Sequence, residues 1–303
     1  MVDLVTGGCG FIGSHIVEEL LRLGKKVRVV DDLSTGHLEN IDTSKVEFIQ
    51  GDCSDLEVAH ESCRGVETVY HLAARASVPF SFEHPEVAKK ANLDSTLSII
   101  KAAEENNIQS IIFSSSSAVY GDEKTLPKTE QSELCPLSPY AEHKLAGEKA
   151  LQKTKTPNVA LRYFNVFGPR QDPSSPYSGV ISLFMKWALE GKAAKMYGDG
   201  KQTRDFVYVK DVVKANLLAS NYAVKHQGHS VVNIGIGQTV TIQSLWKMIC
   251  EATNTQNTSV EYLPSREGDI KDSFADISLA KTILSFKADF GLKEGLKQIV
   301  DYQ

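Results

Sequence analysis

A glycine-rich turn between a short strand and a helix constrains this chain more than any other feature. Residues 3–6 are predicted to form the strand, glycines follow at Gly7, Gly10 and Gly13, and residues 14–23 show helical periodicity. One glycine permits the tight turn, another lets the backbone approach a pyrophosphate, and the third lets helix and strand pack closely. Free N–H groups at the helix N-terminus then face the phosphates. The pattern predicts a dinucleotide-binding βαβ unit.

An acidic pair ends the second predicted strand. Asp31 lies eighteen residues beyond Gly13 and is followed by Asp32. A carboxylate at this place can accept hydrogen bonds from both hydroxyls of an adenosine ribose, and it repels a 2′-phosphate. We therefore expect NAD rather than NADP as the cofactor.

Short apolar runs alternate with helical patterns along the front half of the chain. This alternation predicts an α/β fold built on a doubly wound parallel sheet of the Rossmann type. The alternation of strand and helix patterns stops after Gly168, where three prolines predict a long loop. We expect an NAD-binding domain over residues 1–167 and a smaller mixed α/β domain for the substrate over 168–303, interleaved with the first. The predicted strands are 3–6, 26–31, 46–50, 68–72, 110–114, 158–162, 231–234 and 260–262, and the predicted helices are 14–23, 86–106, 182–189, 209–222 and 242–253.

Composition narrows the class of protein. The 303 residues carry 33 basic and 38 acidic side chains, without the basic surplus typical of nucleic-acid binders. The five cysteines lie at least ten residues apart, which fits a reducing cytoplasm and gives no zinc motif. The histidines show no metal-ligand spacing, so we expect no metal. We also expect no signal peptide and no membrane contact, because the first strand starts at once and no apolar run is long enough to span a bilayer.

Tyr140 and Lys144 lie four residues apart in a predicted helix. Ser138 is suited to the N-cap of this helix and Pro139 to its first position. The tyrosine and the lysine therefore share one helix face. A phenol with a pKa of about 10 is a poor base at neutral pH, but a nearby ammonium and an oxidised nicotinamide favour the phenolate. The pair predicts a proton-transfer residue and its activator.

A run of four serines, 114–117, follows an apolar strand. In open α/β sheets, ligands bind at the carboxyl ends of the strands. A hydroxyl at this edge can bond to a sugar hydroxyl and to Tyr140 together. Ser115, Ser116 and Ser117 are the candidates for this group.

In their order and spacing these motifs resemble the extended short-chain dehydrogenase/reductase family, and within it the 4-epimerases of UDP-glucose and UDP-N-acetylglucosamine. The likeness runs from Thr6 to about Asp276. Besides the glycine turn, the serine run and the tyrosine–lysine pair, the shared motifs are Asp31-Asp32-Leu33, Gly51-Asp52, His71-Leu72-Ala73-Ala74, Arg162-Tyr163-Phe164-Asn165, Gly198-Asp199-Gly200, Arg204-Asp205 and Arg266-Glu267-Gly268-Asp269.

The resemblance implies NAD-dependent epimerisation at C4 of a UDP-hexose through a transient 4-keto sugar. Ser116, Tyr140 and Lys144 fall at the family's catalytic positions. The residues at cofactor-binding positions are Gly7, Gly10, Phe11, Ile12, Gly13, Asp31, Asp32, Ser34, Gly36, Asp52, Cys53, Leu72, Ala73, Ala74, Asn92, Ser114, Tyr140, Lys144 and Tyr163. The residues at substrate-binding positions are Ser116, Asn165, Val180, Tyr197, Arg204, Arg266, Asp269 and Ser273.

Related reactions call for other residues. Sugar-nucleotide 4,6-dehydratases carry Asp and Glu directly after the catalytic serine position, and UDP-xylose-forming decarboxylases carry Glu at the second of these places. Here the two positions hold Ser117 and Ala118, which cannot act as general acid or base. UDP-glucuronate 4-epimerases share the serine run and remain an alternative. A non-catalytic NAD-sensing protein is an alternative from another class.

Two finer expectations follow from the resemblance. In the family, the position four residues beyond Asp269 gates the substituent at C2 of the sugar, and a tyrosine there crowds it. This chain has Ser273, so we expect N-acetylated sugars to be accepted. Family members dimerise through two helices, equivalent here to 86–106 and 139–153, so we expect a homodimer.

Overall fold

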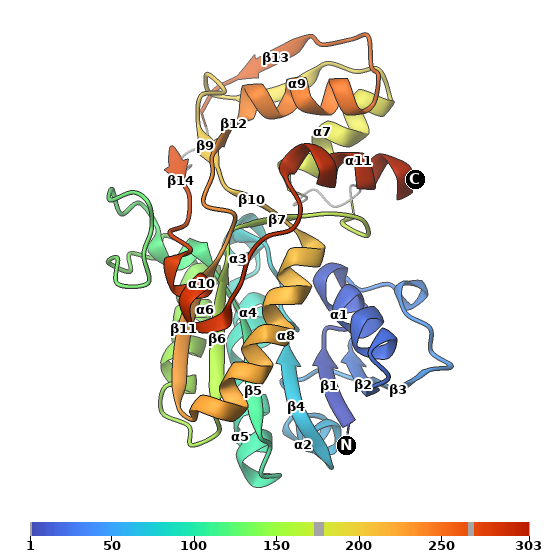
Figure 1. The fold of residues 1–303 in the computed structure, drawn as a ribbon, viewed down its shortest axis with the longest axis vertical. Helices are drawn as coiled ribbons and strands as arrows, with labels where there is room; N and C mark the ends of the chain where they lie inside the picture. Colours follow the sequence, from blue (N-terminus) through green and yellow to red (C-terminus); the bar gives the residue numbers. More distant parts are fainter. Residues whose placement is uncertain (1, 173–178, 266–269, 303) are drawn as a thin grey trace.

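The computed structural model describes residues 2–172, 179–265 and 270–302. Its centre is a seven-stranded sheet in the order β11-β6-β5-β4-β1-β2-β3, with every neighbouring pair parallel (Figure 1). The predicted doubly wound sheet is confirmed. The chain order reverses between β1 and β4, and this reversal is where such folds bind ligands. The strands are β1 Val2–Thr6, β2 Lys26–Asp31, β3 Val46–Gln50, β4 Val66–His71, β5 Ser110–Ser116, β6 Asn158–Tyr163 and β11 His229–Ile234.

Helices cover both faces of this sheet. Successive strand residues point to opposite sides, so Leu4 and Val5 enter different hydrophobic clusters. The cluster of Val5 includes residues of α1, α8 and α10, and the cluster of Leu4 includes residues of α2, α5 and α6. Burial on both faces explains the continuous apolar run of β5. The helices are α1 Phe11–Arg22, α2 Leu56–Cys63, α5 Ser95–Glu105, α6 Pro139–Leu151, α8 Val209–His226 and α10 Ser278–Leu284.

A second, smaller body lies at the top of Figure 1, over the carboxyl ends of the strands. Its core brings together α7 Val180–Leu189, α9 Ile242–Ala252 and α11 Leu292–Tyr302, with Trp246 fully buried among them. Small sheets complete it. They pair β8 Ala194–Tyr197 with β13 Val260–Leu263, β7 Asn165–Phe167 with β10 Phe206–Tyr208, and β9 Thr203–Arg204 with both β12 Val240–Thr241 and β14 Asp272–Ser273.

The second half of the chain returns to the first sheet. Strand β11 pairs along its whole length with β6, and α8 packs on the sheet beside α1. Residues far beyond position 167 therefore build part of the nucleotide-binding sheet.

The helix predicted over 86–106 is present and contains a π-helical turn. Helix α4 Pro85–Lys89, the π-helical turn Lys90–Asp94 and α5 follow one another without a gap. Helix α3 Val78–Glu83 precedes them, and short 3-10 turns occupy Leu38–Asn40 and Ser117–Tyr120. The π turn holds the buried Asn92, whose contacts are described below.

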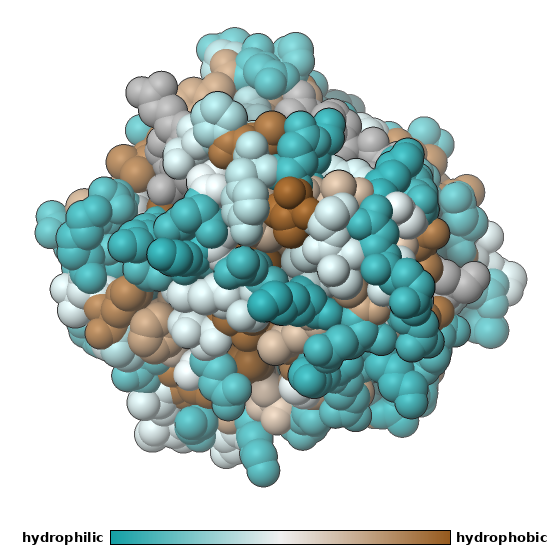
Figure 2. All heavy atoms as spheres, turned by 90° about the horizontal axis from the view of Figure 1, so that it is seen from above, coloured by the Kyte–Doolittle hydropathy of each residue, from teal (hydrophilic) through white to brown (hydrophobic). Residues whose placement is uncertain are grey.

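The surface, the cysteines and the helices can be compared with what the composition predicts. Figure 2, which views the end of the molecule at the top of Figure 1, shows mostly hydrophilic residues with hydrophobic ones in small separate groups. All five cysteines are free. Within 2–172, 179–265 and 270–302, no helix is long and apolar enough to cross a bilayer. The same ranges contain no cluster of three side chains suited to hold a metal ion.

Candidate active site

A cavity of about 450 Å³ opens at the carboxyl ends of β1, β2, β4 and β5, where the strand order reverses. Most residues predicted to bind the cofactor line it. They are Gly7, Gly10, Phe11, Ile12, Gly13, Asp31, Asp32, Ser34, Gly36, Asp52, Cys53, Leu72, Ala73, Ala74, Ser114, Tyr140 and Lys144. Further lining residues, not among those predicted to bind the cofactor, are Thr35, His37, Asn40, Gly51, Arg75, Ala76, Ser77, Phe80, Ala91, Ser95, Arg170 and Asp172.

The glycine turn forms the floor of this cavity. Gly7 has a φ of 66°, and a Cβ added there would lie 2.9 Å from the amide nitrogen of Ala73. A Cβ at Gly13 would overlap the carbonyl oxygen of Gly7. Helix α1 begins at Gly10 without a side-chain cap, so its first N–H groups remain open to an anion in the cavity. The turn fits a pyrophosphate that approaches the bare backbone.

Asp31 stands at the end of β2, where the ribose contact is expected. Its carboxylate accepts hydrogen bonds from the backbone N–H of Cys9 at 2.9 Å and of Leu33 at 2.8 Å. Burial raises the pKa of this carboxyl, and the two backbone bonds oppose the rise. A Cβ at Gly36 would lie 3.0 Å from both carboxylate oxygens, so the glycine lets the loop close over Asp31. The site thus places a fixed carboxylate group against the cavity wall.

The tyrosine–lysine pair lies at the other end of the cavity, on α6. Ser138 caps this helix by accepting the N–H of Ala141 at 3.2 Å, and Pro139 is its first residue, as predicted. Tyr140 and Lys144 lie one turn apart and both line the cavity. The Nζ of Lys144 donates to the carbonyl oxygen of Ser114 at 2.7 Å and lies 5.9 Å from the centre of the Tyr140 ring.

Two of the three serines that could supply a hydroxyl to Tyr140 have different partners. Ser116 interacts with the phenol of Tyr140 and lowers its pKa, and the Oγ of Ser116 accepts the N–H of Ala118 at 3.1 Å. Ser115 points to the opposite face of β5 and donates to Glu148 at 2.5 Å. Alternation along the strand explains this separation. Ser116 and Ser115 therefore lie on opposite sides of β5.

Burial has the largest effect on the pKa of both Tyr140 and Lys144. It raises the pKa of Tyr140, and the bond with Ser116 opposes this rise. Burial also lowers the pKa of Lys144 to about 7, while the nearby carboxylate of Glu148 acts in the opposite direction. The sequence led us to expect an ammonium that favours the phenolate. The desolvation of both groups works against that effect.

Two residues expected to bind the cofactor lie behind the cavity wall. The amide of Asn92 accepts the N–H of Arg75 at 2.7 Å and donates to its carbonyl at 3.3 Å. The hydroxyl of Tyr163 donates to Asn216 at 3.0 Å. Neither Asn92 nor Tyr163 is among the lining residues. In this structure they hold neighbouring segments in place, because their polar groups are already bound within the protein.

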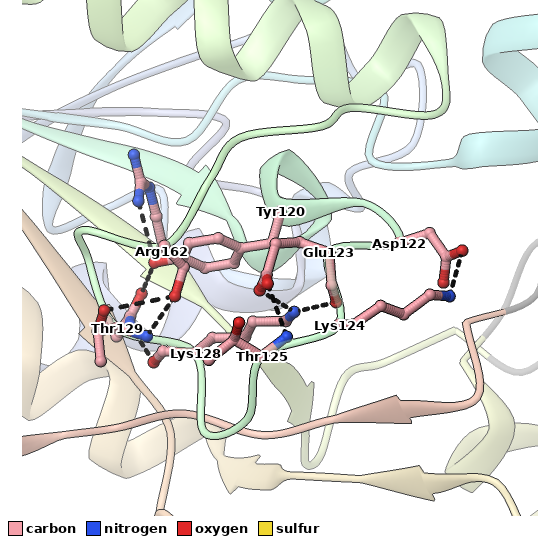
Figure 3. Close-up of polar contacts among 10 residues, drawn as sticks. Tyr120, Asp122, Glu123, Lys124, Thr125, Lys128, Thr129 and Arg162 are labelled. Carbon is pink, nitrogen blue, oxygen red and sulfur yellow. Dashed lines mark hydrogen bonds and ion pairs between the residues drawn. The ribbon is translucent and has the colours of Figure 1, made fainter.

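A buried polar cluster connects the loop after β5 to β6 and β11 (Figure 3). Tyr120 donates to Asn233 at 2.6 Å and accepts from the guanidinium of Arg162 at 2.9 Å. Lys128 is 2% exposed, and its amine binds the carboxylate of Glu123 at 2.6 Å (Figure 3). The cluster fixes the 3-10 turn that follows Ser116.

Of the described residues predicted to bind the substrate, Ser116 ends β5 and the others come from the second body; all lie outside the lining of this cavity. Asn165 is on β7, Val180 begins α7, Tyr197 ends β8, Arg204 is on β9 and Ser273 is on β14. Strands β9 and β14 pair, so Arg204 and Ser273 are register partners. Arg266 and Asp269 lie outside the described residues.

Residues 4–235 match the NAD dependent epimerase/dehydratase family. The chain belongs to this family. A UDP-N-acetylglucosamine 4-epimerase from Methanobrevibacter ruminantium M1, solved with UDP-N-acetylmuramic acid, is 41% identical with a TM-score of 0.93, covering 99% of this chain and 97% of that one. A UDP-glucose 4-epimerase from Thermotoga maritima, solved with UDP-glucose, is 38% identical with a TM-score of 0.93, covering 100% and 98%. A UDP-glucose 4-epimerase from Mycolicibacterium smegmatis is 34% identical, covering 100% and 98%.

Membership of the epimerase/dehydratase family agrees with the geometry of the cavity. Its cofactor is NAD. The glycine turn offers open N–H groups for a pyrophosphate, Asp31 stands at the expected ribose position, and Tyr140 lines the same cavity. The residues present therefore fit the cofactor that the family uses.

Proposed function

We propose that this chain interconverts UDP-hexoses by NAD-dependent epimerisation at C4. The observation that carries the proposal is the position of Tyr140 and Lys144, one turn apart on α6, in the lining of a dinucleotide cavity. Among family reactions, dehydration and decarboxylation need a carboxylic acid next to the serine, and Ser117 and Ala118 supply none. The relatives described above carry 4-epimerase names, which supports the same reaction.

The proposed chemistry assigns one task to each of these side chains. Tyr140, as phenolate, takes the proton of the sugar 4-hydroxyl, and Ser116 holds that hydroxyl and the phenol by hydrogen bonds. Bound NAD supplies positive charge and a hydride acceptor at C4. The 4-keto sugar then turns about its link to the diphosphate, and Tyr140 returns the proton when the opposite face of C4 is reduced. Lys144 keeps Tyr140 oriented and favours its ionised form when its own amine is charged.

The nucleotide part of the substrate is assigned to the second body. Arg204 supplies positive charge for the diphosphate, and Asn165 supplies an amide beside it. Firm binding of UDP with loose binding of the sugar is what rotation of the keto intermediate requires. Within the proposed domains, 1–167 hold NAD and 168–303 hold most of the UDP-sugar contacts.

We infer that N-acetylated hexoses are substrates of this site. Ser273 is small and half-buried on β14, at the position that a tyrosine crowds in relatives restricted to plain hexoses. The relative from Methanobrevibacter ruminantium M1 is named as a UDP-N-acetylglucosamine 4-epimerase, which supports this assignment. UDP-glucuronate is the rival substrate, since its 4-epimerases share the serine run.

The oligomeric state and the cellular location of the protein are also part of this proposal. We infer a homodimer that packs α5 and α6 against their copies, in keeping with the exposed Leu97 on α5. Light scattering on the purified protein tests this, and a monomer would contradict it. The five free cysteines fit a cytoplasmic protein.

The reaction is tested by incubating the protein with UDP-N-acetylglucosamine, UDP-glucose and UDP-glucuronate in parallel and separating the products. We expect the C4 epimer of the first to form without net production of NADH. Release of water or carbon dioxide would assign one of the neighbouring reactions. Bound NAD without turnover of any of the three would assign a sensing role.

A further inference from the structure

Asp205 is fully buried between β9 and β10, and its carboxylate is saturated by backbone groups. One oxygen accepts the N–H of Ile236 at 2.9 Å. The other accepts the N–H of Gly237 at 2.9 Å and that of Ala275 at 3.2 Å. Hydrogen bonds to an ionised acceptor are about twice as strong as neutral ones. This side chain therefore binds two segments of the chain that are far apart in sequence.

The backbone of Asp205 joins two further segments. Its N–H donates to the carbonyl of Ser273 at 3.1 Å, and its carbonyl accepts the N–H of Asn165 at 3.0 Å. Arg204 precedes it directly and is the register partner of Ser273. Asn165, Arg204 and Ser273, three of the residues predicted to contact the UDP-sugar, thus depend on the position of this one residue.

The other partners of Asp205 connect this group to the nucleotide-binding sheet. Ile236 and Gly237 follow β11, the edge strand of the seven-stranded sheet. Gly235 lies between the strand and these residues, and a Cβ there would come within 2.7 Å of the Asp205 carboxylate and 3.0 Å of the Ala275 Cβ. The chain carries a residue without a side chain at the place where the carboxylate needs the space.

We propose that Asp205 is a positioning residue that sets the affinity for the UDP-sugar, because it holds Asn165, Arg204 and Ser273 in fixed register with the end of β11. The inference rests on the proposed function for the identity of the ligand. Asp205 is buried away from solvent and reaches the substrate only through these neighbours. Its loss should therefore weaken nucleotide binding while leaving the chemistry at Tyr140 and the hold on NAD in place.

Two variants perturb this arrangement in different ways. Asp205→Asn keeps the shape but turns an NH₂ group toward backbone N–H donors, so part of the hydrogen bonding is lost. Gly235→Ala leaves the carboxylate intact and displaces it by steric contact. Asp211→Asn is the matched control. The Asp211 carboxylate is 1% exposed and accepts the N–H groups of Asp289 at 2.8 Å and Phe290 at 3.2 Å, neither of which is on β7, β9 or β14.

The experiment measures the affinity for UDP by calorimetry, KM and kcat for the UDP-hexose, bound NAD, and Tm. We expect both Asp205→Asn and Gly235→Ala to weaken UDP binding and raise KM by about tenfold or more, as loss of a bond to a charged group predicts. The turnover number and NAD content should change by less than about threefold. Asp211→Asn should lower the Tm about as much as Asp205→Asn does and should leave the affinity for UDP unchanged.

Several results would overturn the inference. One is a folded Asp205→Asn protein with wild-type affinity for UDP, and another is a control that loses affinity to the same extent. If Asp205→Asn does not fold, Gly235→Ala decides, and unchanged affinity in that variant rejects the inference. Failure of the proposed function looks different, because the wild-type protein itself would then not bind UDP.

Discussion

The carboxylate of Glu148 binds the guanidinium of Arg162 at 2.7 Å inside the protein, and both side chains are at most 4% exposed. Glu148 lies one helical turn beyond Lys144 on α6, and Arg162 lies on β6 behind the serine strand. Ser115 adds its hydroxyl to the same carboxylate. The ion pair therefore connects the catalytic helix to the two strands that end at the site.

Removing one partner of this ion pair should lower the stability of the fold. Glu148→Gln leaves Arg162 buried without a counter-charge, and such losses destabilise proteins by about 3–5 kcal/mol. We expect urea denaturation to show a decrease of this size in the free energy of unfolding. The double variant Glu148→Leu, Arg162→Met removes both charges and should regain most of the loss. Equal stability of the single variant and the wild type would contradict the importance of the pair.

Replacing Tyr140 by Phe should separate chemistry from binding. The variant keeps the ring and its packing but loses the hydroxyl that moves the proton, and general acid–base groups contribute about 10²- to 10⁴-fold to rates. We expect normal Tm and NAD content with turnover reduced by this factor. Steady-state kinetics with UDP-N-acetylglucosamine and a bound-cofactor assay provide the test. Full activity would remove Tyr140 from the proton transfer.

Lys144 should make the stability of the cofactor-free protein depend on pH. Burial lowers its pKa to about 7, whereas lysine in an unfolded chain titrates near about 10.4. Between these values the unfolded state binds more protons, so this group makes the free energy of unfolding rise with pH from about 7 to about 10. Lys144→Met lacks the effect. Denaturation across this range measures the free energy of unfolding of both proteins. The variant should be the more stable of the two near pH 7, and its advantage should shrink as the pH rises. If the free energies of unfolding of the two proteins changed with pH in parallel, the lowered pKa of Lys144 would be rejected.

Ser273→Tyr tests the proposed substituent gate. A phenol ring on β14 should crowd a group at C2, so kcat/KM for the N-acetylated sugar should fall about 10- to 100-fold more than that for the plain hexose. Ser273→Ala is the control, because it removes the hydroxyl without adding bulk. An unchanged ratio of the two kcat/KM values would discard the gate.

Gly13→Ala should empty the cofactor site. The added Cβ overlaps the carbonyl oxygen of Gly7, so the turn must open and the backbone cradle for the pyrophosphate is lost. We expect purified protein with little bound NAD and little activity. Gly291→Ala is the matched control, since a Cβ there meets nothing within 4 Å. Equal NAD content in the two variants would contradict the role given to the turn.

Local sequence determined the parts of this protein that depend on neighbouring residues. The turn from β1 to α1 follows from Gly7, Gly10 and Gly13, and the start of α6 follows from Ser138 and Pro139, because backbone geometry and capping act over a few residues. The four-residue spacing of Tyr140 and Lys144 likewise fixes a shared helix face. The family resemblance that these motifs carry also indicated most residues that line the cofactor cavity.

Tertiary structure decided what depends on long-range contacts. Only strand pairing shows that β11 completes the first sheet, and only the register of β5 separates Ser116, bonded to Tyr140, from Ser115, bonded to Glu148. The low pKa of Lys144 arises from burial by distant segments, which spacing does not reveal. The role of Asp205 has the same origin, because its carboxylate partners lie more than thirty residues away in sequence and meet it only after the chain has folded.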